Sequence, residues 1–459
     1  MNKQMRRQDV DTGITRALAH RVAELRFEDL PADVVSLAKQ CVLDWVAVTV
    51  HGAHEPLVSI LADQVAAEGG NDCATIIGRG RGATPRQAAL VNGAASHALD
   101  YDDVNIRMTG HPTVPVLPAA LAVAECRGAS GRDLIAGFVA GYETECEIGE
   151  IVSPSHYARG FHVTGTVGTF GAAAAVAHLC GLDGKAVATA LGIAGTQAAG
   201  LKSMFGTMCK PLHAGKASES GLLAAELAAR GFTSRTDVLE CLQGFVATHA
   251  DGAKPAHQFS GRTGKYHIAD NLFKYHASCY QTHAAIEALR ALQAEHGFSS
   301  ADVVKITLRH DSGADTVCNI ARPNTGLEIK FSLRMIVALA LAGIDTAVVA
   351  NFSDANARDP ALQALRDKVD VTFEPDWSIT RSEVTVRLAD GRVLEASHDS
   401  GLPERDLGRQ QAKLVAKFRA LVEPKFGSTR TDDIAADIMS LERQADLKHL
   451  TSLLIDVKR

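Results

Sequence analysis

The sequence predicts a mainly helical protein with a smaller α/β domain, because its pattern of apolar residues changes twice along the chain. Up to about residue 260, apolar residues recur at helical spacing, and frequent Ala and Gly allow helix axes to approach closely. Residues 261–401 mix helices with alternating, β-branched segments, and the chain then turns helical again. We therefore expect a discontinuous all-helical domain, residues 1–260 and 402–459, and an α/β lid domain, residues 261–401.

The first domain contains a series of helical segments, several with a Pro near the start or a Gly at the end. They include PADVVSLAKQCVLDWVAVTVHG (31–52), PRQAALVNGAASHALDY (85–101), LPAALAVAECRG (117–128), GRDLIAGFVAGYETECEIGEIV (131–152) and SGLLAAELAARGFTS (220–234). The least polar run, residues 165–182, is rich in Gly and Ala and contains a His. An interior helix explains this run better than a membrane span.

The second domain is predicted from three strand-like segments and two helices between them. VVKITLRHD (303–311) alternates, VDVTFEPDW (369–377) is a further strand, and SEVTVRLADGRVLEASH (382–398) is a hairpin around an Asp-Gly turn. THAAIEALRALQAEHG (282–297) and FSLRMIVALALAG (331–343) have helical spacing. The helical tail from residue 407 is expected to pack back on the first domain.

Charge and cysteine content limit the class of protein. The net charge is −6, and no dense block of Lys and Arg occurs, which argues against a nucleic-acid or anionic membrane partner. Nine cysteines are scattered without a CxxC pair. This odd number at irregular spacing predicts reduced thiols in a cytoplasmic protein and no disulfide framework.

The segment SHALDYDDVNIRMTGHP (96–112) clusters ionisable groups beside apolar helices. On a helix, Asp100 and Asp103 would share a face while Asp102 points elsewhere. A solvated helix end is the plain alternative. His111 precedes a Pro at the entrance of the next apolar helix, where a carboxylate can orient its ring. Asp100 and His111 are therefore candidate site residues.

Two further segments carry candidates. In RGFHVTGTVGTFGAAAA, His162 precedes a Gly/Ala-rich helix that a ligand can approach, although a satisfied core histidine is equally consistent. In FGTMCKPLHAGKASESG, Lys210 and His213 are expected just before a helix that starts near residue 215, with Lys216 in its first turn. Free N–H groups at such a start bind carboxylate or phosphate. The order of a P-loop is absent.

The fourth segment, FKYHASCYQTHAAIEAL, allows two interpretations. His276, Cys279 and His283 have i, i+3, i+7 spacing, which on a helix places three potential zinc ligands on one face. Lys274, just before them, is the alternative chemical group.

Taken together, these segments resemble the MmgE/PrpD family. The resemblance rests on NGAASHALDYDD with GHP, GFHVTGTVGTFGAAAA, KPLHAGKASESGLLAAELAARGFT, FKYHASCYQTH and KFSLRMIVALAL, which fall in order over roughly residues 15–400. It implies a large helical domain, a smaller α/β lid domain, a cleft between them and a homodimer. It also implies chemistry without a metal or other cofactor, so no metal ligands are expected at His276, Cys279 and His283.

The resemblance also implies a set of pocket residues. A decarboxylase-type pocket of this family falls on Asp100, His111, His162, Lys210 and Lys274 as catalytic residues. Substrate contacts are expected at Val104, His213, Cys279 and Met335. Three of these positions depart from the decarboxylase pattern, because Val104 stands in place of a Thr, Cys279 of a His and Met335 of a Tyr. A substrate carboxylate loses polar contacts there, which argues against a cis-aconitate decarboxylase.

Dehydration, decarboxylation and epimerisation in this family can share a carbanion next to a carboxylate, which requires a base and cations. We expect His111 or His162 to move the proton, Asp100 to orient a histidine, and Lys210 and Lys274 to bind carboxylates. Tyr142 is a further candidate acid, with a packed core tyrosine as the alternative.

The predicted function is a metal-independent hydro-lyase of the 2-methylcitrate dehydratase type that acts on a small di- or tricarboxylate. An epimerase of the iminodisuccinate type is the alternative. A non-catalytic binding protein and a metal hydrolase are disfavoured, because the ionisable set is complete and no metal is implied.

Overall fold

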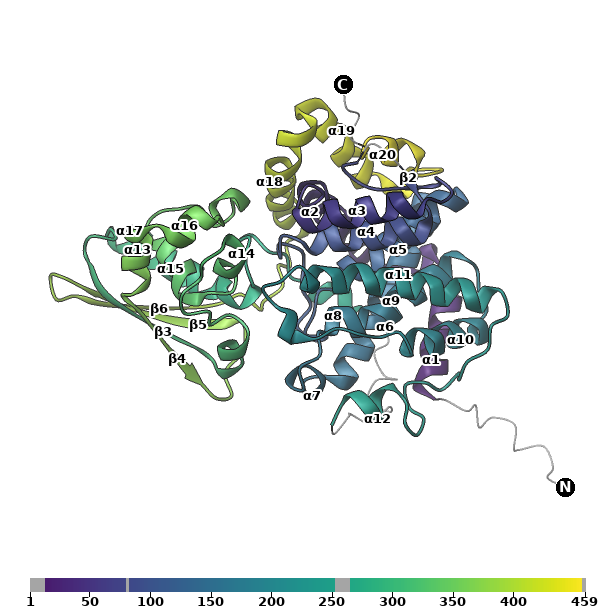
Figure 1. Ribbon diagram of the computed structural model, residues 1–459, viewed down its shortest axis with the longest axis horizontal. Helices are drawn as coiled ribbons and strands as arrows, with labels where there is room; N and C mark the ends of the chain where they lie inside the picture. The colour runs from purple at the N-terminus through teal and green to yellow at the C-terminus, as the bar shows by residue number, and fades with distance from the viewer. Residues whose placement is uncertain (1–12, 80–81, 252–264, 456–459) are drawn as a thin grey trace.

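The computed structural model describes residues 13–79, 82–251 and 265–455. Two lobes are visible in Figure 1, a large helical one and a smaller one in which helices cover a sheet. The predicted fold class, mainly helical with a smaller α/β part, is confirmed.

The large lobe is built from helices of the first half of the chain together with the C-terminal ones. The first half forms α1 (Ile14–Glu24), α2 (Ala32–Gly52), α3 (Pro56–Glu68), α4 (Pro85–His97), α5 (Thr113–Arg127), α6 (Gly131–Val152), α7 (Ser155–Ala158), α8 (Val163–Thr166), α9 (Gly168–Leu179), α10 (Gly184–Gly195), α11 (Cys209–Ala229) and α12 (Phe245–His249). A short ribbon of β1 (Ala74–Thr75) and β2 (Gly82–Ala83) precedes α4.

Small residues allow the central helices to pack at close range, as the composition predicts. A Cβ atom at Gly93 of α4 would lie 2.8 Å from the Cα of Gly215 in α11. A Cβ at Gly221 would lie 2.5 Å from the carbonyl oxygen of Thr169 in α9. Because these distances exclude any side chain, the glycines set how closely α11 lies against both neighbours.

The small lobe is a four-stranded sheet in the order β4-β3-β5-β6. Its strands are β3 (Val303–Asp311), β4 (Val369–Glu374), β5 (Arg381–Leu388) and β6 (Val393–Asp399). β3 pairs in parallel with β4 and antiparallel with β5, and β5 and β6 form the predicted hairpin. Helices α13 (His283–His296) and α15 (Leu333–Leu341) lie over one face of the sheet (Figure 1). Three short helices, α14 (Gly326–Ile329), α16 (Asp354–Arg358) and α17 (Pro360–Arg366), complete the lobe.

The chain then returns to the large lobe through α18 (Leu407–Phe426), α19 (Ser428–Met439) and α20 (Lys448–Ser452). α18 packs along α2, where the side-chain amide of Gln410 donates to Gln40 at 2.8 Å. The ammonium of Lys417 contacts the Asp44 carboxylate at 2.6 Å, and both side chains are buried. This return brings Lys417 beside the segment that follows α4.

One helix of the described residues, α2, is long and apolar enough to cross a membrane by length and composition alone. In the fold it is a core helix, since 78% of its apolar window is buried. The Gly/Ala-rich run of residues 165–182 also becomes an interior segment, with α9 buried over most of its length.

The cysteine prediction needs a correction, because Cys73 and Cys126 form a disulfide bond across 53 residues. The two residues lie beside the β1–β2 ribbon and at the end of α5, and contacts between these elements bring them together. Spacing along the sequence gave no sign of the pair. The other seven cysteines are free.

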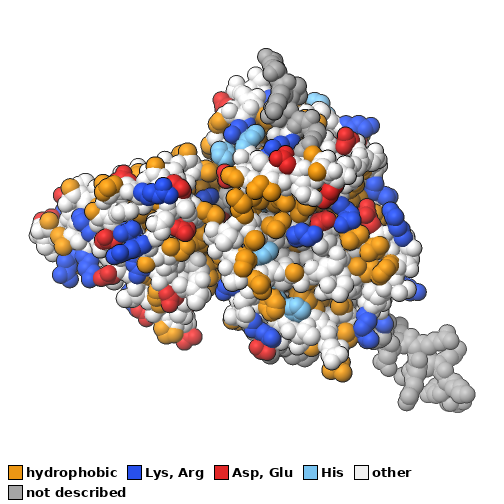
Figure 2. Space-filling model, viewed as in Figure 1, with side chains coloured by type: hydrophobic (Ala, Val, Ile, Leu, Met, Phe, Trp, Pro, Cys, Tyr) orange, Lys and Arg blue, Asp and Glu red, His pale blue; other side chains and the backbone are white. Residues whose placement is uncertain are grey.

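Basic and acidic side chains are interspersed on the face shown in Figure 2, and the surface is hollowed between the two lobes. No large area of one sign of charge is visible on this face.

Candidate active site

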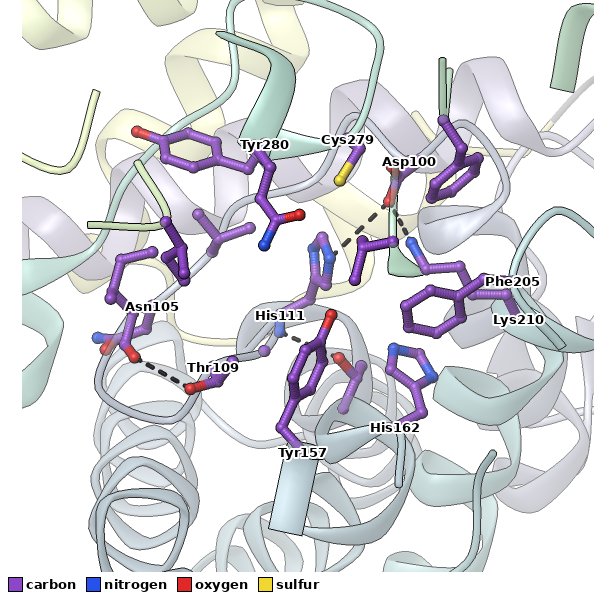
Figure 3. Close-up of a pocket in the computed structure, with 18 of the residues that line it drawn as sticks. Asp100, Asn105, Thr109, His111, Tyr157, His162, Phe205, Lys210, Cys279 and Tyr280 are labelled. Carbon is purple, nitrogen blue, oxygen red and sulfur yellow. Dashed lines mark hydrogen bonds and ion pairs between the residues drawn. The ribbon is translucent and has the colours of Figure 1, made fainter. Parts of the chain in front are cut away.

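A small cavity of about 80 Å³ lies between the lobes (Figure 3). The large lobe contributes Asp100, Val104, Asn105, Ile106, Thr109, Gly110, His111, Tyr157, His162, Thr164, Phe205 and Lys210. The small lobe and the segment leading to it contribute Cys279, Tyr280, Gln281, Val317, Phe331, Ile379 and Thr380. The cavity therefore joins segments that are far apart in the sequence.

The candidate carboxylates lie on an irregular segment and not on a helix, because α4 ends at His97. Asp100 adopts a φ of 51°, a left-handed conformation that is costly for a residue other than Gly. The surrounding structure must therefore hold this residue in place.

Three buried lysines do so by donating to three consecutive backbone carbonyls. The pairs are Lys330 with Leu99, Lys274 with Asp100 at 2.7 Å, and Lys417 with Tyr101 at 2.7 Å. Burial lowers the pKa of Lys330 to about 8. Sequence reasoning identified Lys274 and missed Lys330 and Lys417, since only the fold brings α18 and the end of α14 to this segment.

The Asp100 carboxylate is ionised in spite of its burial. Burial alone would raise its pKa, but Lys210 and Lys274 outweigh this effect and hold the pKa far below its ordinary value. Lys210 forms an ion pair with Oδ1, and the Nζ of Lys274 lies 3.4 Å from the same oxygen. Oδ2 is buried and has no hydrogen-bond partner among the described residues.

The catalytic candidate His111 is oriented by acceptors at its Nδ1 atom. This atom lies 2.9 Å from Oδ2 of Asp102 and 2.9 Å from the carbonyl oxygen of Asp103. Since both partners are acceptors, we assign a proton to Nδ1, so that Nε2 is the nitrogen that can exchange a proton at the cavity. Nε2 lies 3.8 Å from Oδ1 of Asp100 at the cavity.

Asp100 does lie beside a histidine, as expected, since its Oδ1 is 3.8 Å from Nε2 of His111 (Figure 3). The shorter contact of Asp102 with the same ring was not expected. Burial alone would raise the pKa of Asp102, but His111 and His97 hold it well below its ordinary value. Asp103 instead accepts from the Thr113 hydroxyl at 2.6 Å, and burial raises its pKa to about 7.

His97 is a further residue that sequence reasoning missed. Its Nδ1 lies 2.9 Å from Asp102, so this carboxylate sits between two imidazoles. Its ring also stacks on that of His162, with centroids 5.7 Å apart. Burial lowers the pKa of His97 to about 4, so the ring is neutral near pH 7. The signal was present, because His97 lies three residues before Asp100 in the segment already selected.

His162 lines the cavity, whereas His213 lies behind it. Their Nδ1 atoms are 3.0 Å apart, so one ring donates to the other. The Nε2 atom of His162 is buried without a partner among the described residues. Burial holds the pKa of His162 well below its usual value. His162 is thus a neutral ring with one nitrogen left for a ligand.

The predicted helix start near residue 215 is wrong. α11 already begins at Cys209, so Lys210 and His213 lie inside its first turns and no free N–H groups point from residues 215–218. Lys216 is exposed and pairs with Glu219. Lys210 reaches the cavity as a side chain, between the rings of Phe205 and Phe331, each with its centroid 5.2 Å from Nζ.

The three positions that differ from the decarboxylase pattern, Val104, Cys279 and Met335, lie in different places. Val104 and Cys279 line the cavity as expected. Met335 does not, because α15 directs it into the core of the small lobe, where it is fully buried. The expectation of a substrate contact at Met335 therefore needs correction, since its side chain packs in the core and does not line the described cavity.

Tyr157, a residue that was not among the predicted site residues, reaches the cavity. Figure 3 shows the Tyr157 hydroxyl pointing into it, and within the described part of the chain this hydroxyl forms no hydrogen bond. Sequence reasoning missed Tyr157 and instead considered Tyr142. The latter is a buried core residue whose hydroxyl donates to Asn271 at 2.8 Å.

The three potential zinc ligands of the fourth segment do not form a common site in the described structure. The rings of His276 and His283 lie 4.8 Å apart, but His276 bonds Glu287 at 2.7 Å and Thr346 at 2.8 Å, while Cys279 faces the cavity. Among the described residues, the group of three or more potential ligands whose atoms lie within 4.8 Å of one another consists of His97, Asp100, Asp102 and His111.

The two-lobed fold and the ionisable groups around its cavity are features of an enzyme. The N-terminal domain model of the MmgE/PrpD family matches residues 16–258, and the C-terminal domain model matches residues 276–441. The chain belongs to the MmgE/PrpD family, a family of lyase- and dehydratase-type enzymes.

Curated relatives align over nearly the whole chain. Cis-aconitate decarboxylase of Aspergillus terreus (strain NIH 2624 / FGSC A1156) is 26% identical over 483 residues, which cover 99% of this chain and 98% of that protein. The human cis-aconitate decarboxylase is 27% identical over 457 residues, covering 96% and 94%. The cis-aconitate decarboxylase-like protein oryM of Aspergillus oryzae is 27% identical over 475 residues, covering 96% and 97%.

Proposed function

We propose that this protein is a hydro-lyase of the 2-methylcitrate dehydratase type, which removes water from a small hydroxycarboxylate. The observation that carries the proposal is the hydrogen bonding of His111. Its Nδ1 faces two acceptors, so its free Nε2 is a base at the cavity. Asp102 stabilises the imidazolium that forms when Nε2 takes a proton.

The remaining cavity groups match the other needs of the reaction. The Lys210 ammonium binds the substrate carboxylate and stabilises the enolate that develops when His111 removes the neighbouring C–H proton. The C=C bond forms as the C–O bond breaks. The leaving hydroxyl takes a proton from Tyr157 or His162 and departs as water, so charge and atoms balance.

We propose that the reaction needs no metal, on grounds of charge. The four clustered ligand groups already interact with each other and with lysines, since Asp102 accepts from His97 and lies 2.9 Å from Nδ1 of His111, while Asp100 pairs with Lys210 and Lys274. A divalent cation would displace these partners and sit beside two ammonium groups, which repel it.

An epimerase is the second candidate. The observation in its favour is that His162 also lines the cavity with an unpartnered Nε2. Two proton-handling rings at one cavity can remove a proton from one side of a carbon and return it to the other. Decarboxylation, the activity that names the curated relatives, is not proposed, because Val104 and Cys279 offer weak contacts to additional carboxylates.

The test is to incubate the protein with a panel of hydroxycarboxylates in deuterium oxide while following deuterium uptake and alkene absorbance. Exchange together with a new alkene supports the hydro-lyase, and exchange without an alkene supports the epimerase. Absence of both would refute the proposal. Elemental analysis of the active protein should find no stoichiometric metal, and chelator treatment should leave the rate unchanged.

A homodimer and a cytoplasmic location are proposed from the family resemblance. Light scattering coupled to size-exclusion chromatography tests the first, and cell fractionation tests the second.

A further inference from the structure

The cavity is strongly asymmetric in polarity. Asp100, His111, His162 and Lys210 lie together at one part of its wall. The rest is apolar or neutral, and both lobes contribute to it. Its apolar members are Val104, Ile106, Phe205, Val317, Phe331 and Ile379. Lys210 is the one Lys or Arg among the described residues that line this cavity.

The cations around the site are already neutralised almost completely. Lys210, Lys274 and Lys330 face Asp100, and Lys330 also interacts with Glu55. Asp102 provides the second buried carboxylate at the site. Among the lysines and carboxylates at the site, three ammonium groups against Asp100 and Asp102 leave a surplus of one positive charge, and Glu55 reduces this surplus further.

A surplus of at most one charge limits the ligand. One substrate carboxylate neutralises it and pairs with Lys210. A second carboxylate would be desolvated against Val317 or Ile379, and Lys210, the one Lys or Arg that lines the described cavity, is already paired with the first, so its burial carries a large penalty. Neutral groups such as Thr164, Gln281 and the Tyr157 hydroxyl can form hydrogen bonds with a hydroxyl or carbonyl group of the substrate without changing the charge of the cavity.

We therefore propose that the substrate carries a single carboxylate, next to the carbon that loses its proton, and an uncharged, largely apolar remainder. The proposal rests on the proposed function for the reaction and departs from the di- or tricarboxylate that the family resemblance implies. On this proposal, the small-lobe residues that line the cavity, such as Val317, Phe331 and Ile379, select the uncharged part of the substrate.

The test compares ligands that differ only by a methyl group in place of a carboxylate. Crotonate is matched with fumarate, and 3-hydroxybutanoate with malate, and their dissociation constants are measured by isothermal titration calorimetry on the full chain. We expect each monocarboxylate to bind at least about tenfold tighter than its dicarboxylate match. Equal or tighter binding of the dicarboxylates overturns the proposal, and so does the absence of binding by all four.

A variant with an added cation provides the converse test. Ile379, a half-buried loop residue on the apolar wall, is replaced in Ile379→Lys, with Ile379→Met as the uncharged control of similar length. Relative to the control, Ile379→Lys should bind malate and fumarate at least about tenfold tighter and the monocarboxylates no tighter. Unchanged discrimination in the lysine variant would show that charge at this wall does not select the ligand.

The same ligands separate the two proposals. If the monocarboxylates bind tighter but exchange no deuterium, the substrate class stands and the proposed reaction fails. If malate exchanges deuterium and 3-hydroxybutanoate does not, the reaction stands and the substrate class fails.

Discussion

Replacing Asp102 by Asn removes the charge that lies between His97 and His111 while preserving the size of the side chain. Both Nδ1 atoms lie 2.9 Å from Oδ2 of Asp102. An amide oxygen in the place of Oδ2 has two lone pairs and can still accept from both rings, but it carries no negative charge. The imidazolium that forms on His111 when it takes a proton is then less stabilised.

The size of the effect follows from the charge that is lost. A charged hydrogen-bonding partner contributes about 1.5–3 kcal/mol, and tenfold in rate corresponds to about 1.4 kcal/mol. Asp102→Asn should therefore lower kcat by about 10–150-fold. The loss is not complete, because the Asp103 carbonyl remains 2.9 Å from Nδ1 of His111. KM should change little, since Asp102 does not line the cavity.

Steady-state kinetics on the substrate found in the panel measures both parameters. The matched control is Asp103→Asn, a neighbouring buried carboxylate that bonds Thr113 and no imidazole, and its kcat should fall by no more than a few-fold. Wild-type kcat in Asp102→Asn, or an equal loss in both variants, would refute the assignment of His111 as the base that Asp102 orients.

Three further predictions concern other parts of the site. Lys330→Met leaves the Leu99 carbonyl without its ammonium partner and loosens the Asp100 segment. The value of kcat/KM should therefore fall about tenfold or more, while the circular dichroism spectrum stays unchanged. A wild-type kcat/KM would contradict this prediction. Tyr157→Phe should change the free energy of unfolding by no more than about 0.5 kcal/mol, since the Tyr157 hydroxyl has no hydrogen-bond partner in the described structure. If Tyr157 is the acid, the same variant should lower kcat about 100-fold. An unchanged kcat would assign the role of the acid to His162. Burial raises the pKa of Asp103 to about 7, so its stabilising contribution is complete below the ordinary value of 3.8 and is lost as the pH rises through about 7. Asp103→Asn should therefore flatten the fall of Tm between about pH 5 and pH 7, and an unchanged slope would contradict this.

Most of the fold could be predicted from sequence because its elements have regular periodicity. The helical spacing around α2 and α6 and the Asp-Gly turn between β5 and β6 are local signals. The return of α18 to the large lobe was also predicted. The parallel pairing of β3 with β4 was not, because backbone pairing between distant segments leaves no local trace. The Cys73–Cys126 bond was missed for the same reason.

The candidate site could be predicted only in part from local sequence patterns. The motifs identified Asp100, His111, His162 and Lys210, which the structure brings to one cavity. The contacts of Asp102 and Asp103 were not predicted, since helical periodicity was applied to a segment that leaves the helix at His97.

The remaining contributors could not be found from local sequence. Lys330 and Lys417 lie 231 and 316 residues from the carbonyls that they bind. Tyr157 lacked a pattern that distinguishes a cavity tyrosine from a core one.

The central claim is that His111 removes a proton from the carbon next to a substrate carboxylate. The most direct measurement is the initial rate of deuterium incorporation at that carbon in deuterium oxide, for the wild type, His111→Gln and His213→Gln. The account predicts rapid exchange in the wild type, a loss of at least about 100-fold in His111→Gln and a much smaller loss in His213→Gln, which lies outside the cavity. Exchange at the wild-type rate in His111→Gln would contradict it.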